Sequence, residues 1–225
     1  MCYSTAVSFS SAAILTAGGL VCLKKSGAFN PSNGALPLLP LLFGIQQAFE
    51  GVVWWSLGTN DPELLRTSAL GFLFFSHVIW PIVIPFSCYL AEPESRYKGL
   101  FLLMTLLGVV FGFSTFTPLL LNPDWLAVFE VHHSIAYQAR LLYDAVVPRP
   151  IVGLAYMAIV LLPLLMSVRH TYRVLGLMAL LAAMLTIGMF KLAFISVWCF
   201  FAAMISMYVY YIFAVAPEPE ADSTI

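Results

Sequence analysis

Long apolar runs separated by short polar stretches dominate the sequence, and they predict membrane-spanning helices. A helix needs roughly 20 apolar residues to cross the hydrocarbon core of a bilayer. Charged and turn-forming residues cut this chain into runs of about that length. We predict seven transmembrane helices, at Thr5–Leu23, Leu36–Leu57, Ser68–Leu90, Gly99–Leu121, Ile151–Val168, Val174–Phe190 and Leu192–Phe213.

The boundary between the last two helices is the least marked in the sequence. The run from Val174 to Ala216 is apolar except for Lys191 and is about as long as two spans. A tight turn near Gly188–Lys191 accounts for this length better than one very long helix. No run shows the alternation of a transmembrane β-barrel.

The longest connection, from Asn122 to Pro150, has an amphipathic pattern of its own. At about 100° per residue, polar side chains such as Glu130, His133 and Asp144 fall on one side of a helix. We therefore predict an amphipathic helix at Trp125–Val147 that lies on the membrane surface or caps the bundle. The predicted fold is an all-α polytopic bundle in one domain, residues 1–216, followed by a short acidic tail, residues 217–225.

Composition supports a membrane protein and excludes several other classes. Hydrophobic residues make up 61% of the chain and charged residues 9%, whereas soluble domains have about 25% charged residues. Ten basic residues against eleven acidic ones provide no positive field for nucleic acid. The expected partner is the lipid bilayer, and a homo-oligomer or a larger membrane complex remains open.

The basic residues predict the orientation of the helices. The first apolar run has no basic residue before it, and Lys24 and Lys25 follow it, which is the reverse of a cleaved signal. An outside N-terminus and a cytoplasmic C-terminus also agree with the positive-inside rule. In that orientation the inner loops hold Lys24, Lys25, Arg96, Lys98, Arg169 and Arg173, and the outer loops hold Arg66, Arg140, Arg149 and Lys191.

The few polar side chains inside the spans indicate where a site lies. Ionisable groups are costly in a bilayer and usually face the protein interior. Glu50 is the clearest case, and Gln46, four residues earlier, lies on the same helix face. The predicted topology gathers these two and other polar groups near the outer surface. We predict a ligand site formed by Gln46, Gln47, Glu50, His77, His132, Ser196 and Cys199.

Each of these residues also has a purely structural interpretation. Glu50 can bond a neighbouring helix, and His77 can bond a backbone carbonyl that Pro81 or Pro85 leaves free. Cys199 is small and suited to burial. The pattern favours a site, but each residue alone is compatible with packing.

Three stretches of the sequence are distinctive. They are Met1-Cys2-Tyr3-Ser4, the segment PLLFGIQQ from Pro40 with Glu50-Gly51 after it, and the segment SVWCFFAA from Ser196. Together they resemble a family of small bacterial multi-pass membrane proteins of unknown function. The resemblance extends over most of the chain and implies a bacterial inner-membrane protein, but it implies no activity.

Three functions from different classes fit these residues. The first is a bundle that binds, transports or senses a small ligand or ion at an outward-facing site around Glu50. The second is a membrane-embedded enzyme. In it, Glu50, His77 and His132 hold a divalent metal ion for hydrolysis, or Cys2 and Cys199 form a redox pair. The third is an accessory subunit of a larger membrane complex.

Overall fold

Seven helical spans within the described part of the chain are long and apolar enough to cross a membrane, as the sequence predicts. The computed structural model describes residues 4–26, 33–92, 94–131, 133–189 and 193–215. Three spans contain a short 3₁₀ or π-helical turn. The elements are α1 (Thr5–Ser26), the 3₁₀ turn η2 (Leu36–Leu38), α2 (Leu39–Thr59), α3 (Pro62–Phe74), the π-helical turn η3 (Phe75–Ile79), α4 (Trp80–Ala91), α5 (Lys98–Leu121), the 3₁₀ turn η4 (Pro123–Trp125), β1 (Leu126–Val131), β2 (Ser134–Ala139), α6 (Arg149–Met166), α7 (His170–Met189), α8 (Phe194–Tyr210) and the π-helical turn η5 (Tyr211–Val215).

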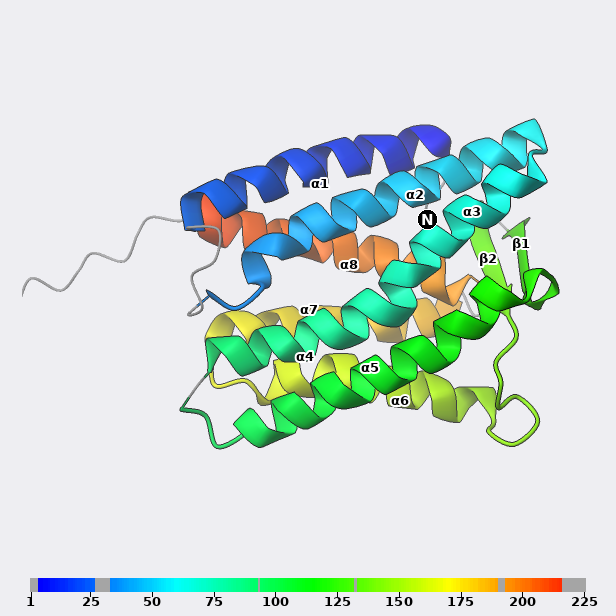
Figure 1. Cartoon of the computed structure of the whole chain (residues 1–225). Coiled ribbons are helices and arrows are strands. Elements are labelled where there is room, and N and C mark those ends of the chain that lie inside the picture. The colour runs from blue at the N-terminus through cyan, green and yellow to red at the C-terminus, as the bar shows by residue number, and fades with distance from the viewer. Residues whose placement is uncertain (1–3, 27–32, 93, 132, 190–192, 216–225) are drawn as a thin grey trace, which may run out of the picture.

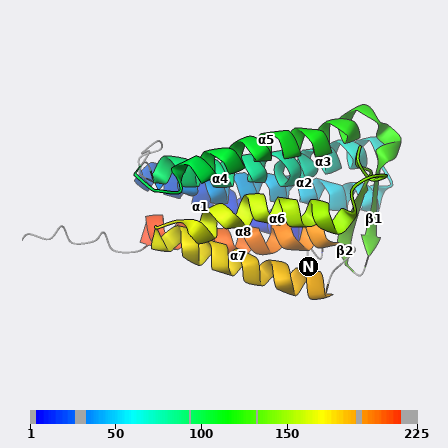
Figure 2. The ribbon, with the colours of Figure 1, turned by 90° about the horizontal axis from the view of Figure 1, so that it is seen from below.

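The helices lie along one common axis, and β1 and β2 lie together at one end of the bundle (Figure 1). We call this the hairpin end. Seen from below, α6, α7 and α8 form one layer, and α1 to α5 form the other (Figure 2). Because the number of spans is odd, α1 starts at the hairpin end and η5 finishes at the opposite end.

The third span begins earlier than its hydropathy predicts. It starts at Pro62 instead of Ser68, because Asp61 caps the helix by accepting a hydrogen bond from the Leu64 amide at 3.0 Å. Asn60 ends α2 in the left-handed conformation, with φ of 53°. Because α3 starts at Pro62, Arg66 lies near the beginning of this helix. It donates a hydrogen bond to the Leu120 carbonyl at the end of α5, at 3.0 Å. The third span therefore includes charged residues, which precede its apolar part.

The predicted amphipathic helix at Trp125–Val147 is wrong, because this segment begins with a 3₁₀ turn and an antiparallel hairpin. Leu126 of β1 pairs with Ala139 of β2, and Val131 pairs with Ser134. Val128, Phe129, Val131, Ile135 and Tyr137 are β-branched or aromatic residues of the kind that favour strands.

The burial of β2 explains why strands form here. Ile135 and Ala136 are fully buried, and the Tyr137 ring stacks on Phe72 of α3 with the ring centres 4.9 Å apart. Consecutive buried residues need contacts on both faces of the segment, which a strand between two packing partners provides. A surface helix would have left half of them exposed.

A second buried carboxylate, Glu92, lies at the end opposite the hairpin. It accepts hydrogen bonds from the Ser167 hydroxyl and from the Val168 amide, the latter at 3.2 Å. Glu92 therefore connects the end of α4 to the α6–α7 connection. The sequence places it in a turn and gives no indication that it is buried.

Glycines of α5 allow its backbone to contact α4 and η3 directly. A methyl group on Gly108 would lie 1.9 Å from the Pro81 carbonyl oxygen, and one on Gly112 would lie 2.8 Å from that of His77. Both neighbouring atoms are backbone atoms, which have little freedom to move. The contact therefore fixes the distance between α4 and α5.

We predict that Gly108→Ala destabilises the protein by about 1–3 kcal/mol, the usual cost of overpacking. Gly99→Ala is the matched control, since a methyl group there meets nothing within 4 Å. Thermal unfolding in one detergent measures both variants. A parental melting temperature for Gly108→Ala would contradict the contact.

Candidate functional site

Glu50 on α2 is fully buried and is held by side chains from two helices. Gln47, one turn earlier, donates from Nε2 to Glu50 Oε2 at 3.1 Å. Ser196 of α8 donates from Oγ to Glu50 Oε1 at 2.6 Å. Hydrogen bonds inside a low-dielectric interior are stronger than those in water. The carboxyl group therefore links α2 to the start of α8.

Gln46 extends this arrangement by one turn along the same face of α2. Its Oε1 accepts from Trp80 Nε1 of α4 at 2.8 Å, and its carboxamide lies beside the Cys199 thiol. Gln46 is fully buried and Cys199 is 1% exposed. The structure thus brings five of the seven predicted ligand-site residues into one buried group. We call Gln46, Gln47, Glu50, Ser196 and Cys199 the polar layer.

Helix α1 covers the polar layer through close helix packing. A methyl group on Gly51 would lie 2.9 Å from the Phe9 ring, and one on Gly44 would lie 2.5 Å from the Thr16 hydroxyl. These two contacts show that α1 runs antiparallel to α2 and place Ser8 near the depth of Glu50. Small residues commonly allow such approach between membrane helices.

A cavity of about 690 Å³ lies beside the polar layer, under the hairpin. This volume is within the range of small-molecule sites, which are about 300–1,000 Å³. Its walls come from η3, α5, β2, the start of α6, the end of α7 and the start of α8, and most of them are apolar. The polar side chains that line it are Ser76, His77, Thr115, Tyr137, Arg149, Tyr156, Trp198 and Cys199.

His77 reaches this cavity from the π-helical turn η3. Its Nδ1 lies 3.0 Å from the Ser76 hydroxyl, which also donates to the Leu73 carbonyl at 3.2 Å. Pro81 has no amide hydrogen, so the regular helical bond four residues back, to the His77 carbonyl, is missing. Single π-helical turns inside α-helices are frequent at functional sites.

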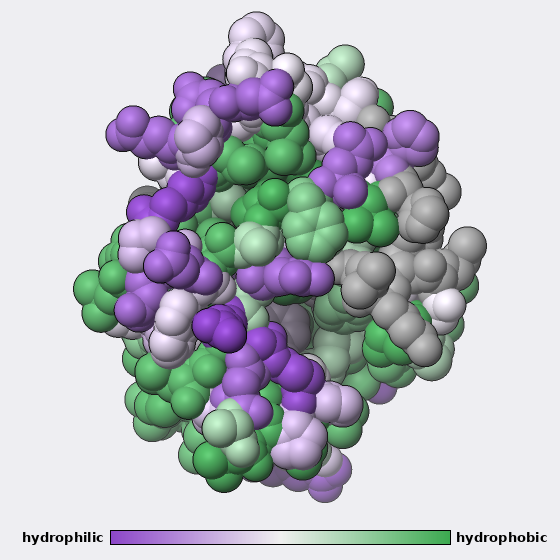
Figure 3. All heavy atoms as spheres, turned by 90° about the vertical axis from the view of Figure 1, so that its right-hand side faces the viewer, coloured by the Kyte–Doolittle hydropathy of each residue, from purple (hydrophilic) through white to green (hydrophobic). Residues whose placement is uncertain are grey.

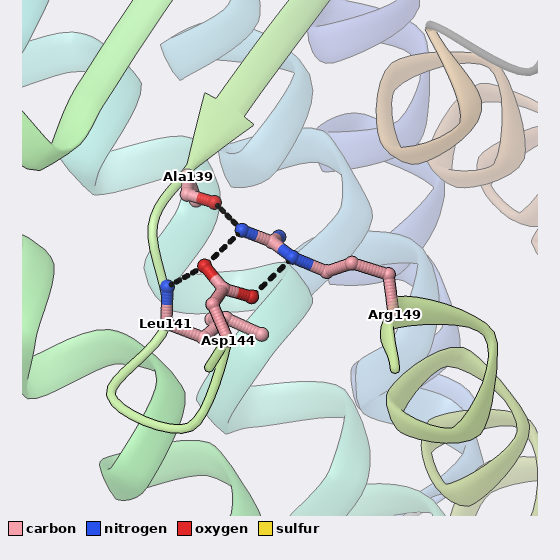
Figure 4. A network of polar contacts seen from close by, with 4 residues as sticks. All are labelled: Ala139, Leu141, Asp144 and Arg149. Carbon is pink, nitrogen blue, oxygen red and sulfur yellow. Dashed lines mark hydrogen bonds and ion pairs between the residues drawn. The ribbon is translucent and has the colours of Figure 1, made fainter. Parts of the chain in front are cut away.

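Arg149, the first residue of α6, joins the hairpin to the rim of the cavity (Figure 4). It donates to the Ala139 carbonyl at 2.6 Å and forms an ion pair with Asp144. Asp144 also accepts from the Leu141 amide at 2.8 Å. These contacts hold the loop of residues 140–148 against the end of β2.

The environment of Asp144 favours its charged form. Burial opposes the charge, but the Leu141 amide and the guanidinium groups of Arg149 and Arg140 outweigh it and hold the pKa of Asp144 below its usual 3.8. The carboxylate is therefore ionised at neutral pH, and its ion pair with Arg149 is intact.

The structure separates the predicted metal ligands. His77 lines the cavity, whereas Glu50 bonds to α8 in the polar layer behind it. His132 lies outside the described residues, and within those residues no three His, Cys, Asp or Glu side chains group closely enough to hold a metal ion. The set of Glu50, His77 and His132 stays a prediction.

The predicted redox pair is also left as a prediction. Cys199 is a free thiol on the cavity wall, next to Gln46. Cys2 lies outside the described residues. A disulfide between them is therefore a sequence-based hypothesis only.

Several residues of the cavity were not predicted. Tyr137 and Arg149 belong to a segment that the sequence assigned to a surface helix and a loop. Tyr156 is one of several aromatic residues inside an apolar span, and the sequence does not distinguish it from residues of the core. The sequence does contain one indication of the role of Arg149. This residue immediately precedes an apolar span, where a charged side chain can face both water and the bundle.

Comparison with known proteins gives a family for the chain. Residues 1–223 match a family described as a family of unknown function (DUF6629). No curated protein and no solved structure matches the chain.

We predict that Ser196→Ala destabilises the protein by about 1–3 kcal/mol, because it removes a donor from a buried carboxylate. Ser206→Ala is the control on the same helix, since the Ser206 hydroxyl donates only within α8, to the Ala203 carbonyl at 2.6 Å. Thermal unfolding in detergent compares the two. Equal decreases in the melting temperature of the two variants would show that the hydrogen bond to Glu50 has no special role.

We expect Asp144→Asn to loosen the loop of residues 140–148 at neutral pH. A carboxyl group with a lowered pKa contributes stability above its unfolded pKa, and that stability disappears as the pH falls through the folded value. Amide hydrogen exchange in the loop should therefore rise about two- to fivefold in the variant at pH 7, the range for an exposed ion pair. After correction for intrinsic rates, the difference should vanish well below pH 3.8, where the parental carboxyl group is protonated too.

Glu130→Gln is the control, because Glu130 is an exposed acid at the turn end of the hairpin, away from the loop. It should leave exchange in the loop unchanged. A parental exchange rate in Asp144→Asn at pH 7 would contradict the role of the ion pair.

Proposed function

The chain belongs to the DUF6629 family, whose function is unknown, and from that premise we propose that it is a membrane protein that binds a small, mostly apolar molecule in the cavity under the hairpin. The observation that carries the proposal is the cavity itself. It combines a volume of about 690 Å³, apolar walls and a few converging polar groups. This combination is typical of ligand sites.

His77 and Cys199 are the predicted ligand-site residues that line the cavity. They come from different helices, η3–α4 and α8, and so provide polar groups on two sides of an occupant. In this proposal His77 is a hydrogen-bonding partner for the bound molecule. Tyr137 and Thr115 provide two further polar contacts from β2 and α5.

The polar layer acts as the support of one cavity wall. On α8, Ile195 and Cys199 line the cavity, while Ser196 bonds to Glu50 on the other side of the helix. Gln46 reaches the Cys199 thiol from behind. Glu50, Gln46, Gln47 and Ser196 therefore position the wall, and this role accounts for buried polar groups next to an apolar cavity.

The structure of this cavity wall is an argument for binding as the activity, more than for transport. The polar layer makes contacts between α2, α3, α4 and α8 within the bundle, and the cavity lies on one side of it. A site that only binds needs one route of access, and the cavity has exposed lining residues on α6 and α7. We therefore propose binding as the activity, with sensing or delivery by a partner as its use.

Filling the cavity tests the proposal. Gly153 of α6 lines it, and a β-carbon there meets nothing within 4 Å, so Gly153→Trp introduces an indole group at the cavity wall. Gly99→Trp is the matched control, an exposed glycine in the first turn of α5 with the same open surroundings. Parent and variants are purified in one detergent, and bound small molecules are extracted and measured by mass spectrometry.

We expect one apolar molecule to copurify with the parent and with Gly99→Trp and to fall about tenfold in Gly153→Trp, the effect of about 1.4 kcal/mol. Equal melting temperatures of the two variants establish that both are folded. If every extracted molecule is present equally in all three proteins, the cavity binds nothing and the proposal fails.

A further inference from the structure

The cavity under the hairpin continues along the bundle as a second, smaller one. The second cavity has a volume of about 60 Å³ and shares Tyr156, Trp198 and Cys199 with the first. Its remaining walls are apolar except for Ser206 and include Leu39 and Leu175, which lie near the end opposite the hairpin. The two cavities therefore adjoin, and we call the line that joins them past these three side chains the apolar path.

One end of this path carries positive charge. Arg149 lines the first cavity at the hairpin end, and its side chain is 53% exposed. Arg140, one residue after β2, also acts on the Asp144 carboxylate. Two guanidinium groups therefore face one carboxylate, and these three side chains together carry one positive charge. The end-on view shows hydrophilic side chains gathered on this face of the molecule, around a hollow near its centre (Figure 3).

The first cavity also reaches the apolar side of the bundle. Leu154 of α6 and Ile187 of α7 line it and are nevertheless 69% and 50% exposed. In α6, the buried residues begin only at Ile159, so the first half of this helix packs loosely against its neighbours. Both exposed residues belong to spans, so the surface that they share faces the acyl chains of a bilayer.

We propose that the occupant is an anionic phospholipid that enters from the bilayer between α6 and α7. One acyl chain lies along the path past Tyr156 and Cys199, and the phosphate lies at the rim with Arg149 and Arg140. Arginine is well suited to phosphate because its planar donors match the phosphate oxygens. This inference rests on the proposed function, and it adds the class of the ligand, its direction and its route of access.

Lipids that differ only in the headgroup test the inference. The purified protein is incubated with an equimolar mixture of phosphatidylglycerol and phosphatidylcholine carrying identical chains, and native mass spectrometry measures which lipid is retained. We expect the parent to prefer phosphatidylglycerol. Arg140→Gln should reduce that preference about fivefold, because each basic residue near an anionic lipid is worth about 1 kcal/mol. Arg140 has an exposed side chain, so the substitution does not disturb the core.

Two controls separate the charge from the cavity. Arg173→Gln removes an exposed charge at the opposite end and should keep the parental preference. Gly153→Trp should lose retention of both lipids, and Gly99→Trp should lose neither. Equal retention of the two lipids by the parent, an unchanged preference in Arg140→Gln, or unchanged retention in Gly153→Trp would each overturn the inference.

The proposed function can survive that result. If Gly153→Trp loses a copurifying molecule that is not an anionic lipid, the cavity binds a ligand and only the assigned class is wrong. If no copurifying molecule depends on Gly153, the binding function and the lipid assignment fail together.

Discussion

A carboxyl group that is buried among membrane helices must keep its hydrogen-bond donors, and Glu50 imposes this condition on the bundle. Ser196 can reach Glu50 Oε1 at 2.6 Å only if the start of α8 lies against the middle of α2. The same register places Cys199, one turn further along α8, beside Gln46 and on the wall of the cavity. The position of that wall therefore follows from a polar contact that lies behind it. In the absence of water, a polar group without a hydrogen-bond partner costs so much free energy that another register of α2 and α8 is disfavoured.

The cavity lies where helix packing changes from close to loose. On one side, Gly108 brings α5 into backbone contact with Pro81, so α4 and α5 leave no room between them. On the other side, α6 has no buried residue before Ile159, and the space between this half-helix and α8 is open. The hairpin and the Arg149–Asp144 ion pair cover the end of that space. The cavity thus forms beside the close contact of α4 and α5, and these two helices leave no gap between them.

The sequence predicted the spans well because membrane insertion depends on local composition. The composition of a helix-length segment can be read directly from the sequence. It also identified Glu50, Gln46 and Ser196 as a group, since buried polar side chains in lipid must find one another. It missed the hairpin because residues 126–139 follow a helical period in the sequence, whereas the formation of strands depends on burial against Phe72, a residue distant in the chain. Arg149 was missed for a related reason. Its role depends on Ala139 and Asp144, whose positions only the folded hairpin defines.

The uneven burial of α6 has a mechanical consequence. Ile159, Val160, Leu161 and Leu164 anchor its second half in the core, while its first half contacts the bundle through Arg149 and through the partly buried Tyr156 and Met157. The helix therefore has a tightly packed second half and a less buried first half. An outward movement of the first half breaks fewer buried contacts than a movement of the second half. A bound molecule can therefore exchange through movement at one end of α6, while the buried second half of the helix keeps its packing.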